Sequence, residues 1–254
     1  MTNEATIEKM KGMKLRGMAQ AFENILRNPS AKFTADEMAA YLVDAEHDDR
    51  YNRKMETLIK NGRFRYQAGL EGLDFSGSRN LDKNQMMRLT NCEWIKKKEN
   101  VIISGATGSG KSYIASALGN QSCRLGYRTL YFSCMKLFTR LKHAKAEGSY
   151  SREISQIQKQ ELLILDDFGM EILDQFSRMA LFEIIEDRQG ENSTIITSQL
   201  PVKKWFEVIG DPTIADAICD RIVHSAVIIE LKTADSLRKV YTKKSGQIPE
   251  QDAG

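Results

Sequence analysis

Residues 105–112, read as GATGSGKS, decide the fold because their glycine spacing and their final Lys-Ser pair suit one kind of chemistry. They match the pattern G-x-x-x-x-G-K-[ST] without exception, follow the apolar run VIIS at 101–104, and precede the helical stretch YIASALGNQSCR. Glycine tolerates positive φ, so the backbone can turn several N–H groups inward at a helix N-terminus, where the helix dipole also favours an anion. The stretch therefore predicts a P-loop that holds nucleotide phosphates.

The P-loop pattern also assigns roles to individual residues. Lys111 is expected to reach the β- and γ-phosphates, and the Ser112 hydroxyl is expected to bind Mg²⁺. A chance glycine-rich turn is the alternative, but a strand and a helix flank the loop in the required order. ATP and Mg²⁺ are thus the predicted cofactors. The predicted nucleotide contacts are Gly105, Ala106, Thr107, Gly108, Ser109, Gly110, Lys111, Ser112 and Tyr113.

A second acidic motif, ELLILDD at 161–167, is typical of the site that supports hydrolysis, which is called Walker B. It ends a buried apolar run with two carboxylates, about 55 residues after the P-loop. We expect Asp166 to hold Mg²⁺ through its water shell and Asp167 to orient or deprotonate the attacking water. Asp is shorter than the Glu more usual at the second place, which leaves room for slower hydrolysis. The alternative is two acids that merely end a strand.

Two further candidates for the catalytic site follow later in the chain. The run STIITS at 193–198 leads into the polar group Thr197, Ser198 and Gln199, of which Ser198 or Gln199 could hydrogen-bond the γ-phosphate or the water; these residues could equally cap the strand. Arg221 lies just before the last strand, where oligomeric NTPases present an arginine to the γ-phosphate of the neighbouring subunit. A surface arginine beside Asp220 is the alternative.

Hydrophobic periodicity divides the chain into two parts. Residues 5–65 are predicted to be helical, with a break at Asn28, a new helix starting at a capping box of Thr34 and Glu37, and a stop at Gly62. One helix is predicted over 81–98. Beyond it, apolar runs alternate with helical stretches, which is typical of a parallel sheet covered on both faces. The predicted strands are 101–105, 129–133, 161–167, 193–198 and 226–231. The predicted domains are a helical unit at 1–68, a linker at 69–80, an ATPase domain at 81–245 and a disordered tail at 246–254.

Composition limits the remaining possibilities. The 254 residues are 41% hydrophobic with a net charge of +3, and no apolar run approaches the length of a membrane span, so the cytoplasm is the expected location and no membrane partner is expected. The four cysteines, at 92, 123, 134 and 219, and the three histidines are too scattered for a metal site. Reduced thiols and no structural zinc are expected.

Beyond these motifs, the chain resembles the IstB-type transposition helper ATPases, within the AAA+ group that also contains the DnaC-type helicase loaders. The likeness rests on KENVIISGATGSGKSYIASALG, ELLILDDFGMEILD, STIITSQLPVKKWFEVIGDPTIADAICDRIVH and the late TADSLRK. It implies a five-stranded α/β AAA+ core behind a small all-α domain, and a homo-oligomer on duplex DNA that works with a transposase. It also implies Arg221 as a finger in trans. Because the chain ends soon after Arg238, the helical lid is expected to be reduced or absent, and Arg238 as a sensor-2 arginine is a guess.

DNA contacts are predicted at two basic clusters. Residues 50–66 carry six cations and one acid, a local charge of +5, with tyrosines and a phenylalanine between them. A solvated helix face is the alternative. The second cluster follows the run at 129–133, in a region that faces the central channel in related initiator and loader ATPases. Neither cluster has an arrangement suited to base readout, so sequence-tolerant backbone binding is expected. The predicted DNA contacts are Arg50, Arg53, Lys54, Lys60, Arg63, Arg65, Arg140 and Lys142.

The sequence therefore favours an ATP-dependent switch that self-assembles on DNA and assists a transposase. A helicase loader of the DnaC type is the alternative, disfavoured by the basic stretch at 50–66. A small-molecule kinase typically needs an arginine-rich lid and no second Walker B acid. A nucleotide-binding module without turnover is separated from the switch by Asp167→Ala, which should abolish ATPase activity and preserve ATP-dependent assembly.

Overall fold

The structure is a computed structural model that describes residues 2–28, 33–73, 75 and 80–232. The chain forms two compact units, residues 1–57 and 58–254. This division falls earlier than the linker predicted at 69–80, because residues 58–68 belong with the second unit. Arg238 and the tail predicted at 246–254 lie outside the described residues.

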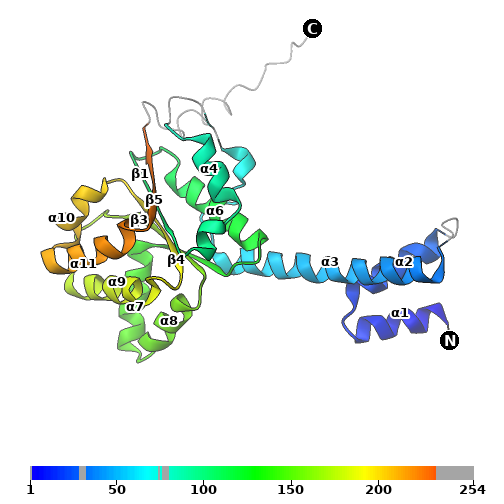
Figure 1. Cartoon of the computed structure of the whole chain (residues 1–254). Helices are drawn as coiled ribbons and strands as arrows, with labels where there is room; N and C mark the ends of the chain where they lie inside the picture. Colours follow the sequence, from blue (N-terminus) through cyan, green and yellow to red (C-terminus); the bar gives the residue numbers. More distant parts are fainter. Residues whose placement is uncertain (1, 29–32, 74, 76–79, 233–254) are drawn as a thin grey trace, which may run out of the picture. The chain divides into compact units, whose positions relative to one another are not determined.

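The first unit consists of helices, as predicted. They are α1 (Asn3–Gly12), α2 (Arg16–Arg27) and α3 (Ala35–Gly62), of which α3 continues into the second unit as one long helix (Figure 1). The predicted capping box is confirmed, since Thr34 N donates to Glu37 Oε2 at 2.8 Å and Glu37 N donates to Thr34 Oγ1 at 3.4 Å. The buried Glu46 accepts hydrogen bonds from Met18 N and Arg50 Nε, which ties α2 to α3.

The second unit is built on a five-stranded parallel sheet in the order β2-β3-β4-β1-β5. The strands are β1 (Asn100–Gly105), β2 (Thr129–Ser133), β3 (Leu162–Phe168), β4 (Ser193–Ser198) and β5 (Ala226–Leu231). All five coincide with predicted strands to within one residue at each end. Successive residues of a strand face opposite sides, so each apolar strand serves two cores. Ile102, Leu163 and Ile196 lie in one core, and Val101, Ile164 and Ile195 in the other.

Helices cover both faces of the sheet, as Figure 1 shows for α6 on one side and α7, α9 and α11 on the other. One predicted helix is wrong in extent: 81–98 forms two helices, because Cys92 adopts a left-handed conformation with φ of 56°. The elements are η1 (Leu70–Gly72), α4 (Lys83–Thr90), α5 (Glu93–Lys96), α6 (Lys111–Arg124), α7 (Cys134–Ala146), α8 (Tyr150–Gln158), α9 (Gln175–Arg188), η3 (Val202–Lys204), α10 (Trp205–Ile209) and α11 (Pro212–Val223).

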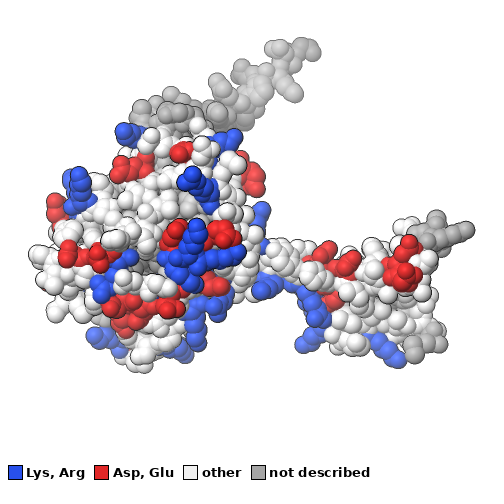
Figure 2. Space-filling view, viewed as in Figure 1, with Lys and Arg blue, Asp and Glu red and all other residues white. Residues whose placement is uncertain are grey.

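The surface of the second unit mixes both signs of charge. Figure 2 shows cationic and anionic side chains close together on the visible face, in keeping with the small net charge of the chain. Within the described residues, no helix combines the length and the apolar composition that crossing a membrane requires.

Candidate nucleotide site

The carboxyl ends of β1, β3 and β4 bring the predicted motifs to one edge of the sheet. The three strands are neighbours in the sheet, and the P-loop follows β1 directly and leads into α6. In open parallel sheets, ligands bind outside this edge. The P-loop, the two Walker B acids and the polar end of β4 therefore meet although they are far apart in the sequence.

The P-loop has the backbone conformation that its glycines allow. Gly108 and Gly110 have φ of 80° and 91°, and α6 begins at Lys111. The side chain of Lys111 lies back along the loop, where Nζ donates to Gly105 O at 2.8 Å and to Ala106 O at 3.0 Å. Burial lowers the pKa of Lys111, while the charges of Asp167 and Asp166 oppose that shift. The lysine is thus placed at the loop that would hold the phosphates.

Asp166 is fully buried at the end of β3 and receives hydrogen bonds from several elements. Its Oδ1 accepts from Ser112 Oγ at 2.9 Å and also from the hydroxyl of Thr197, and its Oδ2 accepts from the Tyr131 hydroxyl. Burial and the neighbouring charge of Asp166 raise the pKa of Tyr131. A buried charge needs such donors, so the site is organised around this carboxylate.

Asp167 occupies a β-bulge, where the pairing of β3 with β4 shifts between Leu165 and Phe168. Its φ of 58° is a strained conformation for a residue other than glycine, and strain of this kind collects at functional sites. Its backbone N donates to Thr197 Oγ1 at 3.0 Å, and its side chain is 30% exposed. The bulge turns the second acid towards the open side of the site, while the first remains buried.

The polar end of β4 contacts the bulge and the P-loop. The Ser198 hydroxyl donates to Phe168 O at 2.8 Å and accepts from Leu200 N at 3.1 Å, so it holds the bulge and does not contact either acid. Gln199 accepts a hydrogen bond from Thr107 Oγ1 of the P-loop at 2.8 Å. Thr197 contacts both acids, and the sequence prediction preferred its neighbours Ser198 and Gln199. The parallel register could have found it, since Leu165 pairs with Ile196 and the next positions are Asp166 and Thr197.

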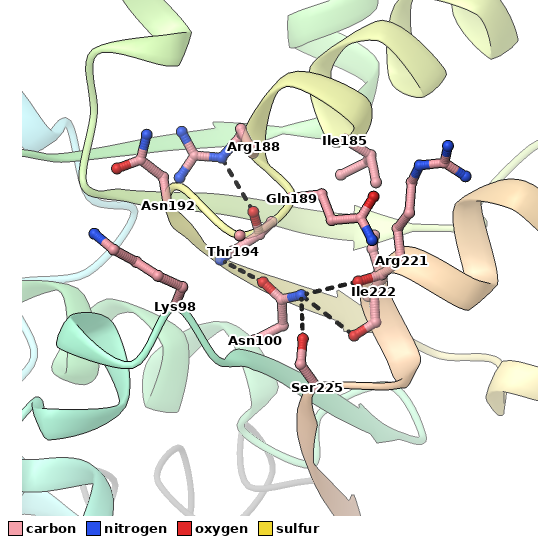
Figure 3. Close-up of a pocket in the computed structure, with 11 residues that line it drawn as sticks. Lys98, Asn100, Ile185, Arg188, Gln189, Asn192, Thr194, Arg221, Ile222 and Ser225 are labelled. Atoms are coloured by element: carbon pink, nitrogen blue, oxygen red, sulfur yellow. Dashed lines mark hydrogen bonds between the residues drawn. The ribbon is translucent and has the colours of Figure 1, made fainter.

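Arg221 lies at the opposite end of the sheet, in a pocket shown in Figure 3. Its guanidinium contacts Glu186 at 2.5 Å and lies over the ring of Phe182. Asn100, the first residue of β1, donates to Ile222 O at 3.3 Å and to Arg221 O at 3.5 Å, and accepts from Thr194 N at 2.9 Å. Because β1 separates this pocket from the P-loop, Arg221 does not contact the nucleotide site of its own chain.

The predicted DNA contacts fall into two groups. Ion pairs hold Arg50 to Glu46, Arg53 to Asp49, Arg140 to Glu153 and Lys142 to Asp174, and Arg65 contacts both Walker B acids. Within the described residues, Lys54, Lys60 and Arg63 form no ion pair. The sequence count of +5 omitted Glu46 and Asp49, which precede the basic stretch on the same helix. Lys54, Lys60 and Arg63 are therefore the better candidates for phosphate contact.

The residues present fit a magnesium ion. Ser112 Oγ and Asp166 Oδ1 lie 2.9 Å apart, and hydroxyl and carboxylate oxygens are the ligands that Mg²⁺ prefers. Asp166 and Ser112 are the residues that would hold it, directly or through water.

The sheet order, the P-loop and the acid pair define an AAA+ ATPase. The fold is similar to that of DnaA from Aquifex aeolicus bound to AMPPCP, with a TM-score of 0.59 and 18% identity over 75% of this chain and 58% of that one. The chain belongs to the family described as IstB-like ATP binding protein, whose model matches residues 8–245. A Sinorhizobium fredii protein named as an insertion sequence ATP-binding protein, y4pL, is 42% identical over 96% of this chain and 100% of its own length. A Pseudomonas fluorescens protein named as an ATP-binding protein of insertion sequence IS1162 is 38% identical over 79% of this chain and 88% of its own.

Proposed function

We propose that this ATPase assembles on duplex DNA under the control of ATP and assists the transposase of an insertion sequence. The observation that carries the proposal is the position of Arg221, at the far end of β1 from the P-loop of its own chain. A site that holds both Walker motifs but has this arginine on another face is suited to completion by a second subunit. The names of the relatives favour transposition over the helicase-loader alternative.

The residues of the site divide the work of hydrolysis between them. The backbone N–H groups of the P-loop and Lys111 bind the phosphates, and Asp167, exposed on its bulge, orients the attacking water or accepts its proton. A bound Mg²⁺ would neutralise charge on the β- and γ-phosphates. Arg221 of a neighbouring subunit would stabilise the transition state, a role that is worth about 10³- to 10⁵-fold in rate in other NTPases.

DNA binding is proposed to rest on phosphate contacts. Lys54, Lys60 and Arg63 lie on α3 or directly after it and have exposed side chains. The Lys142 and Asp174 side chains are 48% and 55% exposed, so a phosphate can compete for this cation. Arg140 is bound through Nε and Nη2 to Glu153, whose side chain is only 13% exposed, so a phosphate competes for it less readily. Such contacts carry no base information, so the binding is expected to be tolerant of sequence.

The test is the salt dependence of duplex binding. Lys54→Ala with Lys60→Ala should weaken binding and reduce the slope of log K against log salt by about 2, because each phosphate contact contributes about 0.9. Fluorescence anisotropy with a labelled duplex measures both quantities. The control is Arg152→Ala with Lys159→Ala, which removes the same charge from exposed positions on and after α8. Equal affinity and equal slope in the two double variants would refute the assignment.

A further inference from the structure

The segment that follows α3, residues 64–68, is fixed to the second unit on both sides of Arg65. Before it, the ring of Phe64 packs edge-on against Tyr131, with 6.5 Å between ring centroids, and lies over Gly119, where a Cβ would collide with it. After it, the ring of Tyr66 lies 6.1 Å from that of Tyr113. Next along the chain, the buried Ala68 accepts a hydrogen bond from Asn120 at 2.8 Å. These contacts fix the backbone position from which the Arg65 side chain extends.

From that anchored segment, Arg65 reaches the Walker B acids. Its Nη1 lies 2.7 Å from Asp167 Oδ2 and 3.2 Å from Asp166 Oδ2. Asp166 is one of the residues that would hold Mg²⁺, and Asp167 is the residue proposed to orient the attacking water. A positive side chain therefore lies on the two groups that metal binding and hydrolysis require.

The stability of the fold does not explain this contact. Asp166 already accepts hydrogen bonds from three hydroxyl groups, those of Ser112, Thr197 and Tyr131, so its burial does not depend on the arginine. The Arg65 and Asp167 side chains are 39% and 30% exposed, and an ion pair between partly exposed groups contributes little to stability. The anchoring of the segment is carried by Phe64, Tyr66 and Ala68 instead.

We propose that Arg65 is a latch that competes with Mg²⁺ for the Walker B carboxylates and leaves them when Mg·ATP binds. A guanidinium and a divalent cation at the same carboxylate repel each other, so the two occupy Asp166 in turn. While the latch is closed, Asp167 is held by Arg65 and is not available to orient water. Arg65 follows the end of α3 by three residues, so the latch gives the nucleotide site a covalent connection to that helix.

The test is a magnesium titration of nucleotide binding, with a fluorescent ATP analogue as the probe. Arg65→Ala should lower the Mg²⁺ concentration for half-maximal binding by about 3- to 10-fold, because the competitor is gone, and should raise ATP turnover at Mg²⁺ concentrations below saturation. Arg65→Lys, which keeps the charge on a shorter side chain without the guanidinium, should give a half-saturating Mg²⁺ concentration between those of the unaltered protein and Arg65→Ala. Arg152→Ala is the matched control, since it removes one exposed guanidinium that forms no ion pair within the described residues.

Two outcomes would overturn the latch. An unchanged half-saturating Mg²⁺ concentration in folded Arg65→Ala would mean that the contact does not oppose the metal. A raised Mg²⁺ requirement with loss of turnover would make Arg65 a group that assists catalysis. Thermal unfolding identifies a variant that has failed to fold. In that case Phe64→Ala provides a second test, because it keeps the Arg65 side chain but weakens the packing that positions it. If Phe64→Ala also leaves the Mg²⁺ dependence unchanged, the latch is refuted. The experiment contains no DNA, so its result is independent of the proposed role in transposition.

Discussion

The hydroxyl of Thr197 forms hydrogen bonds with both Walker B residues. It donates to Asp166 and accepts from the backbone N of Asp167, so one side chain positions the metal-binding acid and the strained bulge beside it. Tyr131 and Ser112 donate further hydroxyl hydrogen bonds to Asp166 from β2 and α6. At this scale the site is a buried carboxylate held by hydroxyl groups from three different elements.

Thr197→Ala should lower kcat for ATP hydrolysis by about 10- to 100-fold, because hydrogen bonds to a charged group are worth about 1.5–3 kcal/mol and 1.4 kcal/mol is tenfold in rate. Steady-state ATPase assays measure the change. Thr197→Ser, which keeps the hydroxyl, should restore most of the rate. Should Thr197→Ser be as slow as Thr197→Ala, the methyl group and not the hydrogen bonds would be responsible.

The candidate site was predictable wherever its chemistry is local in sequence. Lys111, Ser112, Asp166 and Asp167 each lie in a short motif, and the structure places all four at one edge of the sheet. Tyr131 was not predicted, and Thr197 was ranked below its neighbours, because the roles of both residues depend on strand register. The contact of Arg65 with the two acids was not predicted, because they lie about 100 residues further along the chain. The local count of charges assigned Arg65 to DNA binding instead.

At the scale of elements, Asn100 joins three parts of the second unit. Its side chain connects the start of β1 to β4 through Thr194 N and to the end of α11 through Ile222 O. Figure 3 shows it between these elements, beside the backbone of Arg221. The pocket residue Asn100 thus holds the segment from which Arg221 projects.

Asn100→Ala should lower Tm by about 4–8 °C, because leaving these buried backbone groups without partners costs about 2 kcal/mol. It should also lower the ATPase rate of the assembled protein by displacing Arg221. Thermal unfolding and ATPase assays with duplex DNA measure the two effects. Asn192→Ala is the control, since Asn192 lines the same pocket but bonds Gln158 O on the other side. A loss of ATPase activity as large in the control would exclude the specific role.

The strands were easier to predict than the helices, for physical reasons. Each strand is a short, mostly apolar run, β1, β3 and β4 are buried along almost their whole length, and all five strands lie where the sequence places them. The helix predicted over 81–98 contains apolar residues throughout, but Asn91 accepts a hydrogen bond from Glu93 N and Cys92 turns left-handed, which ends one helix and starts another. Such a turn is set by local hydrogen bonding that periodicity does not detect.

At the scale of the whole molecule, the chain consists of a helical unit and an ATPase unit, and its proposed activity needs more than one copy. The P-loop and Walker B acids lie at one end of β1, and Arg221 at the other. ATP is therefore proposed to act at the contact between subunits, where hydrolysis would weaken assembly. Asp167→Ala should keep that contact and lose turnover.

Electron microscopy of the purified protein with long duplex DNA tests this central claim most directly. With ATP, regular assemblies should coat the duplex, and they should persist in Asp167→Ala while the unaltered protein releases the DNA as ATP is consumed. With ADP, or without nucleotide, the DNA should remain bare. Equal assembly with ATP, with ADP and without nucleotide would contradict the account.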